Sequence, residues 1–436
     1  MRTFVTIWIG QLVSTLGSYM SVFALMIWVW DITGSATTLA LVSFFSQLPR
    51  IAITPIAGVI VDRFSRKQLM LLGDVVAAVC TLAIGLLFWQ GQLQVWHLYG
   101  AVALYGCFGQ LQTLAYSTSI ALLVEKENYA RAESMVAAVN YGAAIFAPIL
   151  AGSLYPVIGL RGVITIDLAT FVVAFGTLAI ATIPQPTNTD TPKTIGWRDL
   201  TFGFRYITSK PSLVAMVIAF SLFAIPSDIG KALYNPMILA RSGGDAQALG
   251  AVTTAAGVGG VLGALAVSIS GGFKRRIHGM LLGFIGTGCF KLMMGLGQTP
   301  LVWSASHFMA TLTIPLFYSS SNAIWYAKVP PALQGRVLAA DQMIGLVIGA
   351  IAPLAAGPLA DYVFEPAMQP GGWLTPLFSP LFGTGTGSGI ALIYSATALM
   401  MAIVGLGGYG FRRLREVESL LPDHEATSKA ETANLQ

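Results

Sequence analysis

The sequence predicts an all-α integral membrane protein with twelve transmembrane helices in two six-helix repeats. Hydrophobic residues make up 55% of the 436 residues and charged residues only 10%, and the mean hydropathy is +0.72. Soluble domains, in contrast, carry about 25% charged residues. The apolar runs are about 20 residues long, which suits membrane-spanning helices better than the roughly ten-residue strands of a β-barrel. The two halves of the chain also resemble each other.

We expect twelve apolar segments to cross the membrane, with bounds at 4–29, 37–61, 68–89, 97–124, 133–157, 162–183, 211–235, 246–270, 279–297, 300–327, 337–360 and 389–411. A polar, proline-rich link follows the sixth segment, and its residues 197–207 mix aromatic residues with Arg, as interfacial helices do. The predicted organisation is an N-terminal six-helix bundle (1–183), a cytoplasmic linker with an interfacial helix (184–210), a C-terminal six-helix bundle (211–411) and a cytoplasmic tail (412–436).

The distribution of cations predicts the orientation of these helices. With both termini in the cytoplasm, nineteen of the 24 Lys and Arg residues fall on the cytoplasmic side, and only Arg161 and Arg241 fall on the opposite side. Cytoplasmic loops are enriched in Lys and Arg. We therefore expect a multi-pass protein of the plasma (inner) membrane with both termini cytoplasmic.

The two halves repeat at an offset of 205 residues. Residues 147–154 and 352–359 share five of eight positions, among them the pairs Pro148 with Pro353 and Gly152 with Gly357. Proline favours a kink and small residues allow helices to approach closely. These four residues are candidates for a repeated hinge, and the alternative is that they serve only tight packing.

A short, highly charged turn separates the second and third apolar segments. It runs from Gly58 to Lys67 and contains Asp62, Arg63 and Arg66. Such charges are costly in hydrocarbon, so the turn must lie at a membrane surface. It resembles the signature of the loop between helices 2 and 3 of the major facilitator superfamily, with a serine in place of the usual glycine. The resemblance implies a gating role on the cytoplasmic side, and the alternative is a topology signal only.

Further stretches resemble the efflux branch of that superfamily, which holds macrolide exporters and enterobactin-type siderophore exporters. These stretches are Ile7–Ser18, Thr33–Ala36, Asp199–Ile207 and Gly357–Asp361. The resemblance implies a secondary active exporter of small amphipathic compounds, such as a drug, macrolide, siderophore or other natural product, that works by proton antiport and alternating access. Residues Leu104–Leu111 lack the intramembrane Arg of many proton-driven drug exporters, so a coupling scheme that uses that Arg is not carried over.

Ionisable residues inside the predicted spans are candidates for proton coupling or substrate binding. Asp228 and Lys231 are three residues apart and share a helix face, and Lys291 lies near the centre of another span. One hypothesis is that Asp228 exchanges protons and substrate, modulated by Lys231; the other is a structural ion pair. Arg50 lies at the middle of the second span and could recognise an acidic group on a substrate or pair with a neighbouring Asp.

Weaker candidates are polar. Gln11, Ser14 and Ser18 fall on one face of the first helix, which the resemblance places at the cavity, although they could equally serve inter-helix hydrogen bonds. Asn140 is a similar candidate. We expect Asp167 to be structural, and Asp74 and Asp341 to pair with the Arg-rich cytoplasmic turns.

Other classes of function find no support. The sequence has no P-loop and no enzyme constellation, so we expect no catalytic residues, cofactor or metal site. The net charge of +5 comes from short loops and does not predict nucleic-acid binding. The glycine-rich composition of residues Gly383–Gly389 predicts a flexible linker. We expect a monomer in the lipid bilayer; the rival functions are a lysophospholipid flippase and a non-transporting sensor or scaffold, and import remains open.

Overall fold

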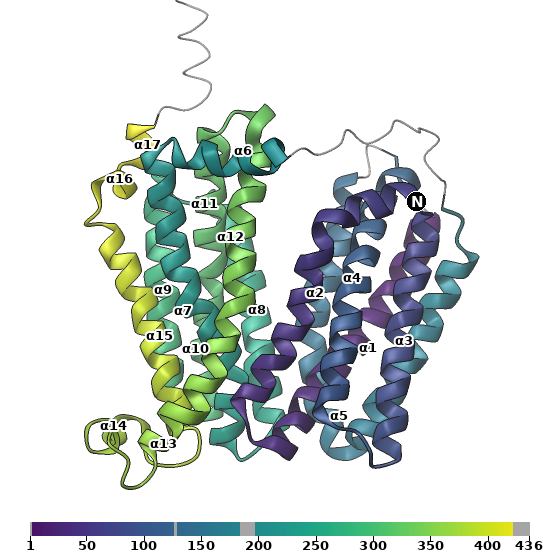
Figure 1. Ribbon diagram of the computed structural model, residues 1–436, viewed down its shortest axis with the longest axis horizontal. Coiled ribbons are helices and arrows are strands. Elements are labelled where there is room, and N and C mark those ends of the chain that lie inside the picture. The colour runs from purple at the N-terminus through teal and green to yellow at the C-terminus, as the bar shows by residue number, and fades with distance from the viewer. Residues whose placement is uncertain (1, 126–128, 184–196, 422–436) are drawn as a thin grey trace, which may run out of the picture. The chain divides into compact units, whose positions relative to one another are not determined.

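The computed structural model describes residues 2–125, 129–183 and 197–421, and every regular element in them is a helix (Figure 1). Nine of the described helices are long and apolar enough to cross a membrane. The predicted all-α membrane fold is therefore confirmed, whereas the number of twelve spans stays a prediction. The part of the linker at 184–196 and the tail at 422–436 lie outside the described residues.

The chain forms two compact units. The N-terminal unit holds residues 1–192 and 238–254, and the C-terminal unit holds 193–237 and 255–436. The N-terminal unit contains α1 (Arg2–Thr33), α2 (Ala36–Arg63), α3 (Arg66–Trp89), α4 (Val95–Leu123) and α5 (Tyr129–Ile180), together with the end of α7 (Pro211–Ser242) and the start of α8 (Ala246–Ser270).

Serine caps begin the second and third helices of the N-terminal unit. The hydroxyl of Ser35 accepts a hydrogen bond from the Thr38 amide at the start of α2, and Ser65 accepts one from Gln68 at the start of α3. Such caps satisfy amides that have no partner within the helix. Ser65 is thus the N-cap of α3, which gives a physical role to the serine that replaces glycine in the charged turn.

The predicted spans 133–157 and 162–183 form the single element α5, which is broken at Gly159. Its backbone there has φ 61° and ψ −173°, a conformation that glycine adopts without steric cost. Two helices therefore meet at this residue, as the sequence predicted from the separate apolar runs. α1 and α5 pack along each other, and buried side chains such as Ile7 and Leu178 contribute to the core of this unit.

The C-terminal unit contains the rest of the helices. They are α6 (Trp197–Thr208), most of α7, the remainder of α8, α9 (Arg276–Leu296), α10 (Pro300–Leu312), α11 (Ile314–Lys328), α12 (Pro331–Pro358), the π-helix η2 (Leu359–Phe364), α13 (Glu365–Met368), α14 (Thr375–Phe382), α15 (Ser388–Gly408), α16 (Arg412–Arg415) and α17 (Val417–Leu420). The predicted span 300–327 is interrupted at Thr313, between α10 and α11.

The predicted helix at 197–207 is confirmed as α6, which packs on α12 at one end of the C-terminal unit. A Cβ on Gly203 would lie 2.2 Å from the carbonyl oxygen of Arg336, so only glycine allows this approach. The guanidinium of Arg336 lies 4.6 Å from the centre of the Phe202 ring, an arrangement typical of a cation–π contact. α6 is thereby attached to the beginning of a long membrane-spanning helix.

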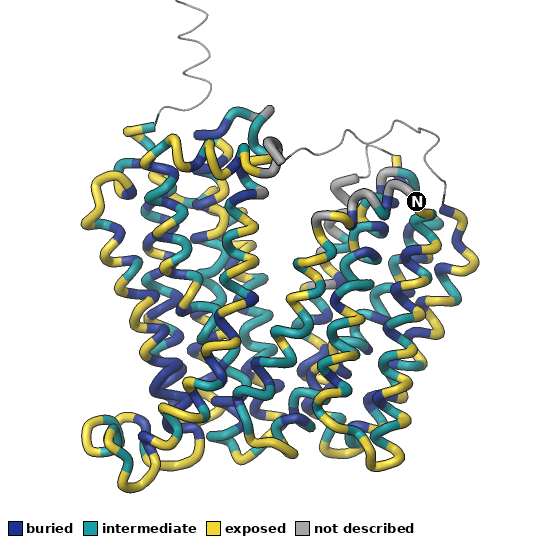
Figure 2. The backbone as a smooth tube through the Cα atoms, viewed as in Figure 1, coloured by how far each residue is buried: buried dark blue, intermediate teal, exposed yellow. Residues whose placement is uncertain are grey.

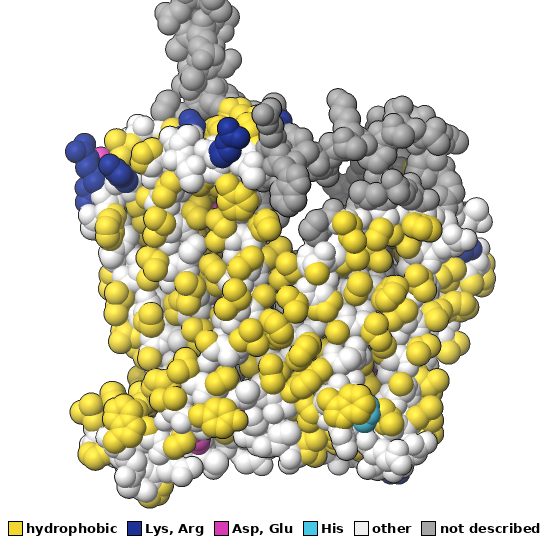
Figure 3. Space-filling model, viewed as in Figure 1, with side chains coloured by type: hydrophobic (Ala, Val, Ile, Leu, Met, Phe, Trp, Pro, Cys, Tyr) yellow, Lys and Arg dark blue, Asp and Glu magenta, His cyan; other side chains and the backbone are white. Residues whose placement is uncertain are grey.

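The surface and core of the helices agree with a membrane environment. Many residues along the spans are exposed, as Figure 2 shows, and Figure 3 shows that hydrophobic side chains cover most of the described surface in this view. The C-terminal core is rich in aromatic rings: Phe223 and Phe284 stack with centroids 3.9 Å apart, and Phe317 packs against both. An apolar exterior of this extent is stable in lipid and would promote association in water.

Candidate functional site

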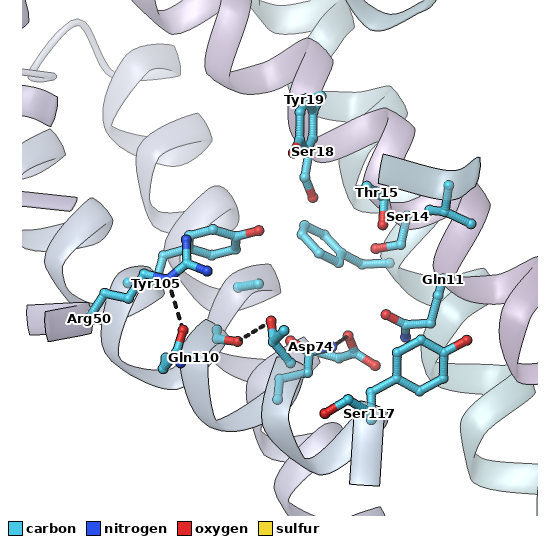
Figure 4. A pocket seen from close by; sticks show the side chains of 18 of the residues that line it. Gln11, Ser14, Thr15, Ser18, Tyr19, Arg50, Asp74, Tyr105, Gln110 and Ser117 are labelled. Atoms are coloured by element: carbon cyan, nitrogen blue, oxygen red, sulfur yellow. Dashed lines mark hydrogen bonds between the residues drawn. The ribbon is translucent and has the colours of Figure 1, made fainter. Parts of the chain in front are cut away.

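The N-terminal unit encloses a polar cavity of about 520 Å³ (Figure 4). Helices α1 to α5 all contribute side chains to the cavity wall. These are Gln11, Ser14 and Ser18 of α1, Arg50 of α2, Asp74 of α3, several polar residues of α4, and Phe171 of α5. The structure thus places the predicted polar face of the first helix on the cavity wall. A polar cavity inside apolar helices is a typical site for a small molecule in a membrane protein.

Arg50 is the cation of the cavity wall. Its Nε donates a hydrogen bond of 2.8 Å to Oε1 of Gln110 on α4, which fixes the orientation of the guanidinium (Figure 4). The side chain is exposed to the cavity, and neither of its Nη groups has a partner among the described residues. Among the described residues, no Asp forms a salt bridge with Arg50.

Asp74 is the carboxylate of the cavity wall, and it is only 4% exposed. Gln112 donates a 2.5 Å hydrogen bond to its Oδ1, and the side chain of Gln11 also interacts with this carboxylate. The expected pairing of Asp74 with an Arg-rich turn is wrong, because Asp74 lies eight positions after Arg66 on α3, which corresponds to about 12 Å of helix.

Asp167 has a different environment in the same unit. It is 1% exposed and accepts hydrogen bonds from Ser18 (3.3 Å) and Thr81 (3.4 Å), which come from two other helices. A hydrogen-bonded buried carboxylate ties helices together. These contacts support the structural role expected for Asp167, and they give Ser18 a role in packing as well as on the cavity wall.

The C-terminal unit holds a second group of intramembrane charges. Asp228 and Lys231 lie on α7 and Lys291 on α9, and Asp228 interacts electrostatically with both lysines. Lys291 is only 9% exposed. Among these three described side chains, however, no nitrogen and carboxylate oxygen approach within the 4.0 Å of a salt bridge. The structure therefore brings the predicted residues together as neighbours without joining them in a permanent ion pair.

The charged turn between α2 and α3 is attached to neighbouring helices. Arg66 donates to the carbonyl oxygen of Thr118 (2.8 Å), and Lys67 donates to those of Ala179 and Ala181 (2.7 and 2.8 Å) at the end of α5. A cation at a helix C-terminus is stabilised by free carbonyl groups and by the helix dipole. Gly58 lies within α2, and the side chains of Asp62, Arg63 and the candidate Asn140 lie outside the described part of the chain.

The candidate hinge residues lie at close helix contacts. A Cβ on Gly250 of α8 would lie 2.7 Å from the carbonyl oxygen of Pro148, and 3.5 Å from the Cα of Gly152. This is the close approach that small residues allow. In the other repeat, Pro353 and Gly357 are buried in α12, directly before the π-helical η2.

Matching contacts extend the internal repeat into three dimensions. Arg66 donates to the Thr118 carbonyl, and Arg276 donates to the Ala323 carbonyl, with offsets of 210 and 205 residues. The same offsets relate Gly73, which packs on Gln112, to Gly283, which packs on Phe317.

These equivalences show how the two units differ. Asp74 follows Gly73 in one unit, and Phe284 follows Gly283 in the other. The polar pair of Asp74 and Gln112 is thus replaced by the aromatic pair of Phe284 and Phe317, whose ring centroids are 5.3 Å apart. The repeat is asymmetric at this position, with polar groups in the N-terminal unit and aromatic rings in the C-terminal unit.

Sequence reasoning missed two glutamines of the site. Gln110 orients Arg50 and Gln112 binds Asp74, and both glutamines lie on α4. A signal was present, because two amides two residues apart inside an apolar helix are uncommon and indicate polar partners nearby.

Known proteins resemble the chain over most of its length. The family model described as Major Facilitator Superfamily matches residues 7–353. Macrolide efflux protein A of Streptococcus pyogenes is 24% identical over 365 residues, which cover 80% of this chain and 88% of that protein. The multidrug efflux pump Tap of Mycolicibacterium fortuitum is 22% identical over 400 residues, covering 88% and 90% of the two chains.

Solved structures share the fold. A bacterial homologue of the human lysosomal transporter Spinster, in an inward-facing and unoccupied conformation, superposes with a TM-score of 0.69 at 13% identity and covers 93% of this chain and 95% of its own. The nucleoside transporter NupG gives a TM-score of 0.71 at 11% identity, covering 94% and 100%.

Proposed function

The chain belongs to the Major Facilitator Superfamily, and from this premise we propose that it is a secondary active exporter of small amphipathic compounds, driven by proton antiport through alternating access. Members of this superfamily transport small molecules across membranes, so the chain is a membrane transporter and not an enzyme. The direction, the coupling ion and the class of substrate are the proposed parts.

The cavity of the N-terminal unit is the observation that carries the proposal. It combines Arg50 and Asp74 with aromatic side chains such as Tyr105 and Phe171. Polar groups oriented by neighbours provide specificity, and aromatic rings provide apolar contact area. Such a wall suits a compound with a polar group and an apolar body. The efflux proteins of similar sequence support export as the direction of transport.

Proton coupling is proposed for Asp228. Its carboxylate lies near Lys231 and Lys291 without forming a salt bridge, so it is available to bind a proton or a substrate. An intramembrane carboxylate is a frequent element of proton relays. We assign Lys231 and Lys291 the role of modulating this group, because nearby cations favour the charged form of a carboxylate.

The remaining assignments complete the proposal. The cation distribution supports an inner-membrane location with cytoplasmic termini. We assign gating to the turn at residues 58–67, and bending to the Pro and Gly positions shared by the two repeats. In this arrangement the two six-helix bundles would alternate access to the substrate, and the protein would work as a monomer.

The test uses the purified protein in proteoliposomes with an imposed pH gradient. Three dansyl probes serve as transported compounds: dansylglycine, its neutral methyl ester and the amine dansylcadaverine. We expect wild-type protein to drive uptake of at least one probe, and nigericin to stop that uptake by collapsing the gradient. In Asp228→Asn, gradient-driven uptake should be lost while probe counterflow persists, because the binding cavity remains intact.

Asp245→Asn is the matched control. Asp245 Oδ1 accepts the amides of Gln247 and Ala248 at the start of α8, and Asn caps a helix as well as Asp does. This variant should transport normally. Full gradient-driven uptake in Asp228→Asn would remove Asp228 from the coupling mechanism. Movement of fluorescent lysolipid instead of the probes would favour a flippase, and no flux of any compound would favour a sensor or scaffold.

A further inference from the structure

We infer that the cavity of the N-terminal unit binds the anionic group of its substrate through the two free Nη groups of Arg50, so that the preferred substrates are amphipathic carboxylates or related anions. This inference rests on the proposed transport function and specifies its substrate class.

The guanidinium is held in an orientation suited to anion binding. Its Nε donates to Oε1 of Gln110 at 2.8 Å, so one edge of the planar group is occupied. The two Nη groups remain, in a side chain that is exposed to the cavity and makes no further hydrogen bond with described residues. Arg presents its donors in a fixed planar fork that matches the two oxygens of a carboxylate, and a fork that is oriented beforehand loses less entropy on binding.

Within the described part of the chain, no carboxylate forms a salt bridge that would neutralise the charge of Arg50. Asp74 is the carboxylate of the same wall, but it is 96% buried and its Oδ1 is bound by Gln112. Charged groups within membranes are usually paired. The partner that the fold does not supply to Arg50 would therefore come with the substrate.

The wall around the guanidinium suits the rest of such a substrate. Tyr19, Tyr105, Tyr116 and Phe171 line the cavity with aromatic rings, and Ser14 and Gln11 add neutral polar groups. Aromatic rings bind an apolar body, and neutral polar groups bind hydroxyl or amide substituents without a preference for charge. A positively charged amine would meet the exposed Arg50 in the cavity and would be disfavoured by like-charge repulsion.

The test measures binding separately from transport. Protein in nanodiscs of zwitterionic lipid is titrated with dansylglycine, its methyl ester and dansylcadaverine, and dansyl fluorescence is corrected with empty nanodiscs. We expect the carboxylate to bind more tightly than the ester and the amine. Arg50→Gln should weaken dansylglycine binding by about tenfold or more, since it removes charge-assisted hydrogen bonds, and should change ester binding by less than about twofold. Arg50→Lys, which retains the charge and loses the fork, should fall between them.

Arg161→Gln is the control for loss of a cation elsewhere in the unit. Arg161 lies 5.8 Å from the centre of the Phe88 ring, away from the residues that line the cavity, and its substitution should leave all three affinities unchanged. Equal weakening of carboxylate and ester in Arg50→Gln would show a structural role and overturn the inference, as would equal affinity of the wild type for all three probes.

Three further outcomes separate the inference from related explanations. Competition of dansylglycine by lysophosphatidylglycerol at lower concentrations than by free short-chain carboxylates would assign the anion to a lipid headgroup and overturn the assignment to a soluble carboxylate. If the protein exports the ester or the amine as efficiently as dansylglycine, export stands and the inference fails. If it transports none of the probes but binds the carboxylate through Arg50, the anion site stands and the proposed export fails.

Discussion

Replacement of Glu365 tests how the long loop before α15 is held to the membrane-spanning helices. The Glu365 carboxylate accepts the amides of Gly387 (2.5 Å), Gly389 (3.0 Å) and Ile390 (3.2 Å), all at the N-terminus of α15. A Cβ on Gly389 would lie 2.2 Å from the carbonyl oxygen of Phe364, so the backbones meet closely here. Within the run Gly383–Gly389, which the sequence predicts to be a flexible linker, Gly387 and Gly389 are therefore bound at the start of α15. The flexibility of the run stays a prediction.

The expected effect follows from the number of hydrogen bonds. Glu365→Ala leaves three amides without their acceptor, and all three belong to the buried residues Gly387, Gly389 and Ile390. An unsatisfied buried amide costs about 1–3 kcal/mol, and loss of an N-cap costs about 0.5–2 kcal/mol. Allowing for relaxation, we expect local opening to become about 2–4 kcal/mol easier, which corresponds to amide exchange about 30-fold to 1000-fold faster.

Hydrogen–deuterium exchange of the protein in nanodiscs measures this effect at residues 383–396. Glu365→Gln should show a smaller change, of about tenfold, because the amide oxygen still accepts while the charge at the helix N-terminus is lost. Gln369→Ala is the control, since the Gln369 side chain is exposed and makes no hydrogen bond. Unchanged exchange in Glu365→Ala would refute the assignment of this carboxylate as the cap of α15.

Three further predictions concern the ends of the helices. In Gly203→Val, the new side chain meets the Arg336 backbone, so α6 should separate from α12 and exchange its amides at least about tenfold faster, whereas Thr208→Val should not. Lys67→Met removes the cation bound to two carbonyl groups at the end of α5 and should lower the free energy of unfolding by about 1–2 kcal/mol; thermal denaturation in detergent measures this, and recovery in Lys67→Arg would support a charge effect. Hydrogen bonds from Arg412 and Arg415 lower the pKa of Glu416. The contribution of these hydrogen bonds to stability should therefore be present above the ordinary pKa of glutamate and lost as the pH falls through the lowered pKa. A ¹³C titration of the carboxyl group measures this pKa. An unshifted titration would contradict it.

Much of the fold could be predicted because hydropathy, charge and turn residues act locally. The span 246–270 coincides with α8, and the helix at 197–207 ends within one residue of α6. The break at Gly159 lies between two predicted spans. The break at Thr313 was not predicted, because the apolar run continues through it and no single residue there indicates the end of a helix.

The site could be predicted only in part. Ser14 and Gln11 share a helix face, so their position on one wall follows from the 3.6-residue period. The hydrogen-bond partners of Arg50 and Asp74 could not be predicted from the sequence, because both partners lie on α4. They are 60 and 38 residues away in the chain, respectively. Which side chains meet between helices depends on the rotation of each helix, and one residue corresponds to about 100° of rotation.

The sequence by itself determined that this protein is a helical membrane transporter of the Major Facilitator Superfamily, since the composition, the apolar runs and the repeated motifs are all properties of the linear chain. Only the tertiary structure decided that the polar cavity belongs to the N-terminal unit and that Phe284 and Phe317 occupy the equivalent place in the C-terminal unit. It also decided that the two Nη groups of Arg50 make no hydrogen bond with the described residues. The physical reason is that burial, hydrogen bonding and the compensation of charge depend on neighbours that packing brings together from distant parts of the chain.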